Sequence, residues 1–377
     1  MHTNGSSFQR DYDLHGLAGI RLIDASLSDV AAVTRQIGPL PTSLTRDPDI
    51  IIKFVDQLPT SSPVRYLGLG DAGFTDDAFL VLRGRHGTRA RAQIRFEQIG
   101  KGCEILCERG LSAVPLLIPI LNLTVLSRGA IPLHASAFTY KGTGVVVTGW
   151  AKGGKTETLL AFMARGAVYV GDEWVYISGD GQRMYGIPQP IRIWDWHLGN
   201  LPQYREIVDR SDLMRWRAIH MVLTMKGLIE RGAHKKDSNG SILSRAIPIM
   251  KRQLGVDLPP ERLFNGSFGT LSGQFDRLIF VTSHESDGVT VQPIDPLEVA
   301  RRMVFSLQYE RLDFMSFYQK FRFAFPDAAN ELIERAEDLQ REMLTRVLAN
   351  KKAYAVFHPY PVSIPALFEA ISPLVNS

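Results

Sequence analysis

Residues 144–173 read GVVVTGWAKGGKTETLLAFMARGAVYVGDE, and this stretch decides the fold class. The run Gly144–Thr148 is rich in β-branched residues and predicts a buried strand. Glu157–Arg165 has the composition of a helix, and Gly166 follows it as a C-terminal cap. Val168–Val170 predicts a second apolar strand. This alternation of strand, helix and strand is typical of an α/β fold.

The loop between the first strand and the helix, Gly149–Thr156, matches the pattern G-x-x-x-x-G-K-[ST] in full. Its two adjacent glycines allow backbone angles closed to other residues, so that successive N–H groups can point at one anion. The start of the helix adds the positive end of its dipole. Lys155 would bring a mobile charge to the β- and γ-phosphates, and the Thr156 hydroxyl would be a ligand for Mg²⁺. We therefore expect a nucleotide-binding site formed by Gly149, Lys152, Gly153, Gly154, Lys155, Thr156 and Glu157.

Two carboxylates, Asp172 and Glu173, stand at the end of the second predicted strand, one helix beyond the loop. Mg²⁺ prefers carboxylate oxygens together with phosphates and water. A reacting hydroxyl group needs a carboxylate within hydrogen-bonding reach to take its proton. The pair is therefore a candidate for metal binding and for base catalysis.

Length and composition limit the class of protein, the number of domains and the kinds of partner. The chain has 377 residues, of which 45% are hydrophobic and 22% charged, so it is long enough for two globular domains. The net charge of +4 is small for this length and gives no reason to expect a nucleic-acid partner. The two cysteines, Cys103 and Cys107, rule out a disulfide scaffold, and we expect them to be half-buried thiols.

The most apolar stretch, Leu111–Leu126, is shorter than a bilayer span of about 20 residues and contains prolines at 115 and 119. We therefore expect a buried helix with a disturbed start, and no membrane span. The polar segment Met1–Arg10 lacks the apolar core of a secretory signal. The expected location is the cytoplasm.

Periodicity predicts the organisation outside the central stretch. Residues 1–48 are expected to be rich in loops, with one helix near Ser28–Ile37, and Asp49–Glu108 to form an antiparallel sheet. These segments predict an N-terminal β-rich domain at 1–110, followed by a catalytic domain at 111–377. Within the second domain we expect strands at Leu133–Tyr140, Arg277–Thr282 (paired with Val289–Pro293) and Ala353–Phe357, helices at Pro296–Leu312 and Ala328–Asn350, and a basic surface loop at Arg231–Asn239.

The stretch from His134 to Val175 resembles the catalytic core of the bacterial HPr kinase/phosphorylase family. In that family a His opens the first strand, the phosphate loop ends in Gly-Lys-Ser-Glu-Thr, and two aspartates follow the helix. Here His134 lies 21 residues before Lys155, and Asp172 and Glu173 lie 17 and 18 residues after it, which is the family spacing. The resemblance is strong over residues 134–175 and weaker over residues 277–305.

The resemblance implies a fold and a set of roles. The fold would be an α/β (α+β) phosphate-loop core of the HPr kinase/phosphoenolpyruvate carboxykinase type, with an N-terminal, mainly antiparallel β domain. Asp172 would help to bind the metal, and Glu173 would be the general base toward the acceptor hydroxyl. Lys155 would hold phosphate, and His134 would stand beside the base or the transferring phosphate and tune its charge. The family is hexameric, which leaves a homo-oligomer as an open expectation for this chain.

Two departures from the family pattern bear on the function. Trp150 stands in the loop, where it could stack on a base or a partner, or cap the core. The family's Glu-x-Arg-Gly signature, tied to reverse phosphorolysis of phosphoserine, is replaced by residues 188–197, PQPIRIWDWH. There Asp195 is a candidate for the missing metal carboxylate, and Arg192 for a contact with phosphate or substrate. The missing signature argues against phosphorylase activity and against HPr as the substrate.

The leading hypothesis is an ATP- and Mg²⁺-dependent kinase that transfers the γ-phosphate to a hydroxyl group of a peptide, a protein or a small molecule. The N-terminal domain would then recognise the acceptor. The alternative is a nucleotide-binding regulatory or scaffold protein with little turnover. The donor stays open among ATP, ADP, GTP and pyrophosphate. A carboxykinase-like reaction is disfavoured, because the sequence does not reveal the additional metal- and carboxylate-binding residues that it needs.

Overall fold

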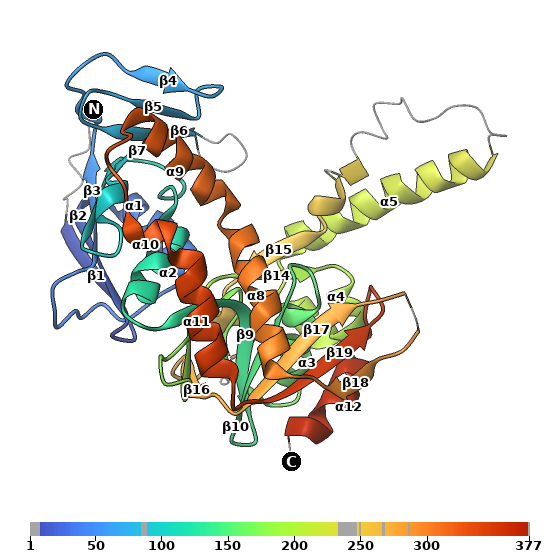
Figure 1. The fold of residues 1–377 in the computed structure, drawn as a ribbon. Helices are drawn as coiled ribbons and strands as arrows, with labels where there is room; N and C mark the ends of the chain where they lie inside the picture. Colours follow the sequence, from blue (N-terminus) through green and yellow to red (C-terminus); the bar gives the residue numbers. More distant parts are fainter. Residues whose placement is uncertain are drawn as a thin grey trace.

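The computed structural model describes residues 8–83, 89–232, 247–248, 250–265, 268–285 and 287–375. Over these residues the fold is mixed α/β, with an eight-stranded, a nine-stranded and a two-stranded sheet. Figure 1 shows the two large sheets in different parts of the molecule, with three C-terminal helices running between them. These helices are α8 (Pro296–Glu310), α9 (Leu312–Ala324) and α11 (Ala336–Leu348).

The eight-stranded sheet is formed by the N-terminal part of the chain, in the order β1-β2-β3-β8-β7-β6-β5-β4. Its strands are β1 (Phe8–Leu14), β2 (Ala18–Ala25), β3 (Ile50–Val55), β4 (Arg65–Leu67), β5 (Ala72–Phe74), β6 (Phe79–Arg83), β7 (Arg89–Ile94) and β8 (Cys103–Glu108). Strand β3 is parallel to both β2 and β8, and the other pairings are antiparallel. The sheet is thus mainly antiparallel, as predicted, with two parallel pairings that the sequence did not indicate.

The expectation that residues 1–48 are rich in loops is wrong for the part that the structure describes. β1 and β2 form a hairpin whose core-facing side chains, Tyr12, Leu14, Ile20 and Leu22, are buried. Charged residues between them obscure the period-two pattern in the sequence. The predicted helix is present as α1 (Leu27–Ile37), which begins at a capping box and connects the parallel strands β2 and β3.

The nine-stranded sheet holds the stretch that decides the fold class. Eight of its strands follow the order β16-β13-β12-β9-β10-β17-β19-β18. The ninth strand, β11, pairs with β9. β10 is antiparallel to β9 and parallel to β17, which is parallel to β19, so three carboxyl ends meet at one edge. The strands are β9 (Ile131–Tyr140), β10 (Thr143–Gly149), β11 (Val168–Gly171), β12 (Trp174–Ile177), β13 (Arg183–Gly186), β16 (Ser272–Gln274), β17 (Arg277–Ser283), β18 (Thr290–Pro293) and β19 (Lys352–His358).

One predicted strand pairing is wrong. β18, expected to pair with β17, pairs instead with β19, which lies between them. The side chains explain the order, because Ala355 and Val356 of β19 are buried whereas Thr290 and Gln292 of β18 are exposed. The more apolar strand takes the interior position, and the more polar strand takes the edge.

The helices follow the predictions more closely than the strand order does. The buried helix expected within 111–126 is α2 (Leu117–Ser127). α3 (Lys155–Met163) follows the phosphate loop, and α12 (Ile364–Val375) packs against it near the end of the chain. The helix expected at 296–312 ends at Glu310, where α9 begins after a one-residue break, and the helix expected at 328–350 is divided into α10 (Glu331–Glu334) and α11.

Helix α9 packs on the N-terminal sheet although it comes from the other end of the chain. The ring of Phe321 lies 5.8 Å from Phe79 on β6 and 5.2 Å from Phe96, which lies between β7 and β8, centroid to centroid. One hydrophobic core therefore includes residues from Tyr12 to Ala355. The domain boundary at residue 110 stays a prediction, and the packing shows that residues beyond it complete the N-terminal sheet.

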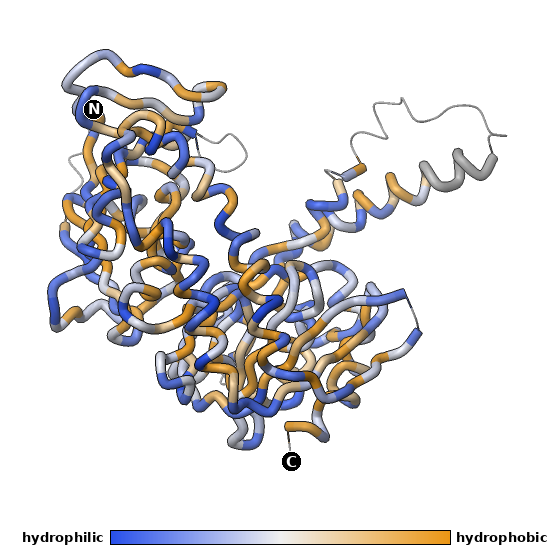
Figure 2. The backbone as a smooth tube through the Cα atoms, in the orientation of Figure 1, coloured by the Kyte–Doolittle hydropathy of each residue, from blue (hydrophilic) through white to orange (hydrophobic). Residues whose placement is uncertain are grey.

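The two-stranded sheet and its helices fill the region between β13 and β16 in the sequence. The elements are β14 (Ile191–Trp194), α4 (His197–Asn200), α5 (Arg210–Gly232), β15 (Gly255–Leu258) and α7 (Pro260–Leu263). Figure 1 shows α5 extending away from the rest of the molecule, and Figure 2 shows apolar positions on the coloured part of this helix. Residues 233–239 of the predicted basic loop lie outside the described residues. No helix in the described ranges is long and apolar enough to cross a bilayer.

Candidate phosphate-binding site

The loop predicted to bind phosphate lies at the carboxyl end of β10 and leads into the first turn of α3. Gly154 precedes the helix with a φ of +102°, and Lys152 has a φ of +62°, so both residues are left-handed. A Cβ atom on Gly154 would lie 2.2 Å from His358 Nε2, which leaves room for glycine alone. The backbone therefore agrees with the sequence pattern, because a glycine-dependent turn opens a helix whose first N–H groups can receive an anion.

The Lys155 side chain folds back over the loop that precedes it. Its Nζ donates to the carbonyl oxygen of Trp150 at 3.0 Å, and the residue is 6% exposed. Burial lowers the pKa of this ammonium, while the charges of four carboxylates act in the opposite direction, namely Glu173, Asp172, Glu310 and Glu157. A buried cation beside the N–H groups of such a loop is suited to neutralising a polyphosphate.

Thr156 and Asp172 meet beside the loop. Thr156 Oγ1 donates to Asp172 Oδ2 at 3.0 Å, and Ser136 Oγ donates to Asp172 Oδ1. The two hydroxyls and the carboxylate are hard oxygen donors and fit Mg²⁺, which commonly takes one or two protein carboxylates together with phosphate and water. The sequence analysis missed Ser136, although it lies two positions after His134 on the same face of β9.

The electrostatics of Asp172 also favour a cation at this point. The residue is 3% exposed, and burial raises the pKa of its carboxyl, with the charge of Glu173 acting in the same direction. Hydrogen bonds from Ser136 and Thr156 and the charge of Lys155 act against that rise. A divalent cation would stabilise the ionised carboxylate. The ionised form of Asp172 is therefore more favourable with a bound metal than without one.

The predicted base, Glu173, lies in the turn between β11 and β12 with a φ of +66°. β9 and β12 pair His134 with Trp174, which brings the imidazole beside the turn. Glu173 Oε2 lies 3.1 Å from His134 Nε2, and the Glu173 side chain is 56% exposed, so a reactant can reach it. On the other side of the ring, His134 Nδ1 lies 3.1 Å from Oε1 of Glu310, the last residue of α8, which the sequence analysis missed.

Two buried histidines support the loop and the first turn of α3, and the sequence analysis gave neither a role. His358 Nε2 lies 2.9 Å from the carbonyl oxygen of Gly153. His197 Nε2 lies 3.3 Å from Glu157 Oε1. Burial acts to raise the pKa of the Glu157 carboxyl, but the contact with His197 outweighs it and the pKa is lowered. Glu157 was predicted to bind nucleotide. In this structure its carboxylate contacts the imidazole of His197.

Trp150 and Lys152 give the loop an exposed outer surface. The indole of Trp150 is 50% exposed and lies 5.0 Å from the ring of Tyr309 on α8, centroid to centroid. Of the uses considered for Trp150, stacking on a partner or a base remains available, because the ring does not cap the core. The Lys152 side chain is exposed, where it can meet an incoming anion.

Asp195 and Arg192 each contact another side chain in this structure. The Asp195 carboxylate contacts Nε2 of His220 on α5, and Arg192 forms an ion pair with Asp257 at 3.0 Å. Both side chains therefore have a partner on the small sheet or on α5, and the roles of Asp195 at a metal and of Arg192 at a phosphate stay predictions. Among the residues that the structure describes, no group of three or more His, Cys, Asp or Glu side chains is arranged to hold a metal.

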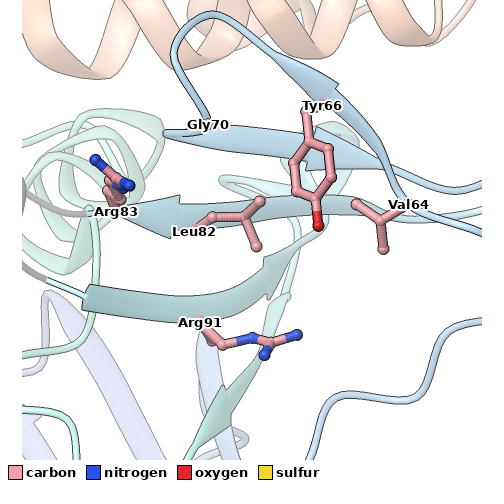
Figure 3. Close-up of a pocket in the computed structure, with 6 residues that line it drawn as sticks. All are labelled: Val64, Tyr66, Gly70, Leu82, Arg83 and Arg91. Carbon is pink, nitrogen blue, oxygen red and sulfur yellow. The ribbon is translucent and has the colours of Figure 1, made fainter.

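A hollow of about 250 Å³ lies on the N-terminal sheet, apart from the phosphate loop. Figure 3 shows its lining, which comes from β4, β6, β7, the turn before β5 and the residue before β4, namely Val64, Tyr66, Gly70, Leu82, Arg83 and Arg91. Two of the lining residues are arginines, and Arg91 Nε lies 3.2 Å from Glu108 Oε1. The N-terminal sheet thus carries a concave surface, and the role of the N-terminal part of the chain in recognising the acceptor stays a prediction.

The sequence has no match among known families or curated proteins. No family model matches the chain, and no curated protein does. The functional argument therefore rests on the loop, the buried lysine, the Thr156–Asp172 contact and the carboxylates around His134.

Proposed function

We propose that this protein is a Mg²⁺-dependent kinase of the HPr kinase-like type, which transfers the γ-phosphate of ATP to a hydroxyl group. The observation that carries the proposal is the convergence of a hydroxyl, a buried carboxylate and a buried lysine at one loop. Thr156 Oγ1 lies 3.0 Å from Asp172 Oδ2, and Lys155 Nζ contacts the loop backbone. A polyphosphate with its metal needs these groups together.

Each group has a defined task in the proposed reaction. Lys155 and the N–H groups of the loop bind the phosphates, while Thr156 and Asp172 hold Mg²⁺, which when bound neutralises charge on the phosphate oxygens. Glu173 accepts the proton of the acceptor hydroxyl. The hydroxyl oxygen then forms a bond to the γ-phosphorus as the bond to the β-phosphate oxygen breaks, and ADP leaves with that electron pair.

The exposed carboxylate separates this proposal from a binding-only role. A loop that only binds nucleotide has no use for an accessible carboxylate beside the γ-phosphate position, and Glu173 is 56% exposed and oriented by a buried imidazole. The missing family signature, replaced by residues 188–197, supports a kinase without phosphorylase activity. The acceptor is a hydroxyl of a peptide, a protein or a small molecule.

The test compares three variants in nucleotide binding and in transfer of labelled γ-phosphate to a panel of hydroxyl-bearing peptides and metabolites. Glu173→Gln keeps ATP binding and loses transfer by about 10²- to 10⁴-fold, the usual contribution of a general base. Lys155→Ala loses binding itself. Glu298→Gln is the matched control, because its carboxylate pairs with Arg302 on the surface of α8. Nucleotide binding without any transfer by the wild type would instead identify a regulatory or scaffold protein.

A further inference from the structure

Two aromatic side chains, Trp196 and Tyr360, lie together in a part of the molecule that the proposed reaction does not use. Their ring centroids are 6.3 Å apart, and the rings stand at 79° to each other. Trp196 is half-buried and Tyr360 is 59% exposed, so the pair presents open ring surface. Trp196 directly precedes α4, and Tyr360 lies two residues beyond the end of β19. Two segments that are distant in the sequence thus meet at this pair.

A buried histidine holds Trp196 beside the first turn of α3. His197 follows Trp196 in the chain and is fully buried. Its Nδ1 accepts a hydrogen bond from the backbone N–H of Trp194, and its Nε2 lies 3.3 Å from Oε1 of Glu157. The Trp196 ring packs across this imidazole at a centroid distance of 4.2 Å. The indole is therefore fixed relative to the helix that begins at the phosphate loop.

A second buried histidine holds Tyr360 beside the loop itself. His358 Nε2 lies 2.9 Å from the carbonyl oxygen of Gly153, and one residue separates His358 from Tyr360. Burial raises the pKa of the Tyr360 phenol, and the charge of Glu157 acts in the same direction, so the phenol lies within electrostatic reach of that carboxylate. Both aromatic residues are therefore connected to the start of α3, one through His197 and the other through β19.

The order of the strands places this pair opposite Glu173. In the nine-stranded sheet, the order β12-β9-β10-β17-β19 puts the phosphate loop, which follows β10, between the turn that carries Glu173 and the end of β19. β12 and β19 each lie two strands from β10, or about 10 Å at the usual strand spacing. A nucleoside triphosphate whose γ-phosphate faces Glu173 therefore extends its nucleoside across the loop, towards Tyr360.

We propose that Trp196 and Tyr360 form the subsite for the base of the nucleotide, a purine that stacks on these rings. The direction in which the nucleotide lies rests on the proposed function. Stacking uses the face of the base and needs no hydrogen bonds to its edges, and the bicyclic ring of a purine offers more surface than a pyrimidine does. The phosphate donor is then a purine nucleoside triphosphate, because pyrophosphate has no ring that these side chains could hold.

The other exposed aromatic pair at the loop, Trp150 and Tyr309, lies on the side of the proposed base catalyst. Glu310, the next residue on α8, has Oε1 3.1 Å from Nδ1 of His134, and Nε2 of that ring lies 3.1 Å from Glu173. The acceptor has to approach on this side for its hydroxyl to reach Glu173. The nucleoside is therefore assigned to the pair at the end of β19.

The test compares the binding of ATP and of tripolyphosphate, each with Mg²⁺, by calorimetric titration, because tripolyphosphate has the phosphates without the nucleoside. Tyr360→Ala and Trp196→Ala each weaken ATP binding by about 5-fold or more and change tripolyphosphate binding by less than about 2-fold. Tyr360→Ala removes an exposed ring, so it tests the subsite even if truncation of the half-buried indole unfolds the protein. Tyr360→Phe keeps the ring and retains the affinity for ATP. Phe323→Ala, whose ring is 75% exposed on α9, is the control and changes neither affinity.

Three results would overturn the subsite and leave the proposed kinase standing, provided that the wild type binds tripolyphosphate. They are an equal loss of both affinities in Tyr360→Ala, no loss of either, and a selective loss of ATP binding in Trp150→Ala instead. The first would show that the phenol acts on the loop, and the other two that the base binds elsewhere. A folded wild type that binds neither compound would overturn the proposed function and the subsite together.

Discussion

The Asp172 carboxylate is buried at the end of β11, with the hydroxyls of Ser136 and Thr156 donating to it. Burial raises its pKa in the folded protein above the value of the unfolded chain. A group of this kind contributes stability that is fully present below its unfolded pKa and is lost as the pH rises through the folded pKa. At neutral pH without a metal, the ionised residue therefore costs free energy of folding.

Asp172→Asn is expected to raise the free energy of unfolding of the metal-free protein, by roughly 1–2 kcal/mol at about pH 8, and to abolish transfer of phosphate. The measurement is urea unfolding in the presence of a chelator, from about pH 5 to pH 8. The wild type loses stability over that range relative to the variant.

The control for this substitution is Asp56→Asn, because the Asp56 side chain is 95% exposed. It should change stability by less than about 0.5 kcal/mol. A less stable Asp172→Asn protein, or one that still transfers phosphate at the wild-type rate, would contradict the metal-binding role of the carboxylate.

At the same scale, the sequence predicts the site residues that belong to one continuous stretch. Lys155, Thr156, Asp172 and Glu173 were all identifiable, because the loop, the helix and the strand that carry them are adjacent in the chain. Ser136 was within reach of the same reasoning, from its position on β9. Asp195, by contrast, was chosen because it stands in the segment that replaces the family signature, and its carboxylate contacts His220 on α5.

At the scale of elements, the loop is supported by strand β19, which the sequence analysis placed correctly but did not connect to the site. His358 is the last residue of β19, and β19 is parallel to β17, the parallel neighbour of β10. Carboxyl ends of parallel strands meet at one edge, so the correct strand order would have predicted His358 near the loop. The sequence analysis predicted no neighbour for β19, so it could not place His358 near the loop.

Gly154→Ala should destabilise the junction between β10 and α3. The residue has a φ of +102°, and the new Cβ atom would lie 2.2 Å from His358 Nε2, so the substitution adds backbone strain and a steric clash. We expect a loss of about 2–4 kcal/mol in stability and a loss of nucleotide binding. Thermal unfolding and calorimetric titration with Mg²⁺ and ATP measure the two effects.

The matched control is Gly166→Ala, at the other end of the same helix. Gly166 has a φ of +84°, but no heavy atom lies within 4 Å of the added Cβ, so only the backbone strain applies. Its cost should be about 1–2 kcal/mol, with nucleotide binding retained. Equal losses in the two variants would show that the His358 contact contributes nothing to the loop.

At the scale of the whole molecule, the N-terminal sheet and the C-terminal helices share one hydrophobic core. The sequence predicted the mixed α/β class from one stretch, because alternation of strand and helix is a local pattern. It did not predict that α9 covers the N-terminal sheet, because the contact between Phe96 and Phe321 joins segments more than 200 residues apart. Local periodicity carries no information about such a pairing.

Phe321→Ala should therefore destabilise the N-terminal sheet as well as α9. Its ring is 3% exposed and stacks on Phe96 at 5.2 Å, so its loss costs about 3–5 kcal/mol. Hydrogen exchange of amides in β6 and β7, together with urea unfolding, measures the effect. Phe323→Ala on the same helix is the control, because that ring is 75% exposed and should contribute less than about 0.5 kcal/mol. Protection of β6 and β7 unchanged in Phe321→Ala would mean that the sheet is stable without α9.

The central claim is that the loop between β10 and α3 binds the phosphates of a nucleotide through Lys155. Calorimetric titration of the purified protein with ATP and Mg²⁺, wild type against Lys155→Ala, tests it most directly. The account predicts saturable, Mg²⁺-dependent binding by the wild type and a loss of at least about 100-fold in affinity in the variant, since a buried cation facing the phosphates is removed. Equal binding by the two proteins, or binding of no nucleotide by the folded wild type, would contradict the account.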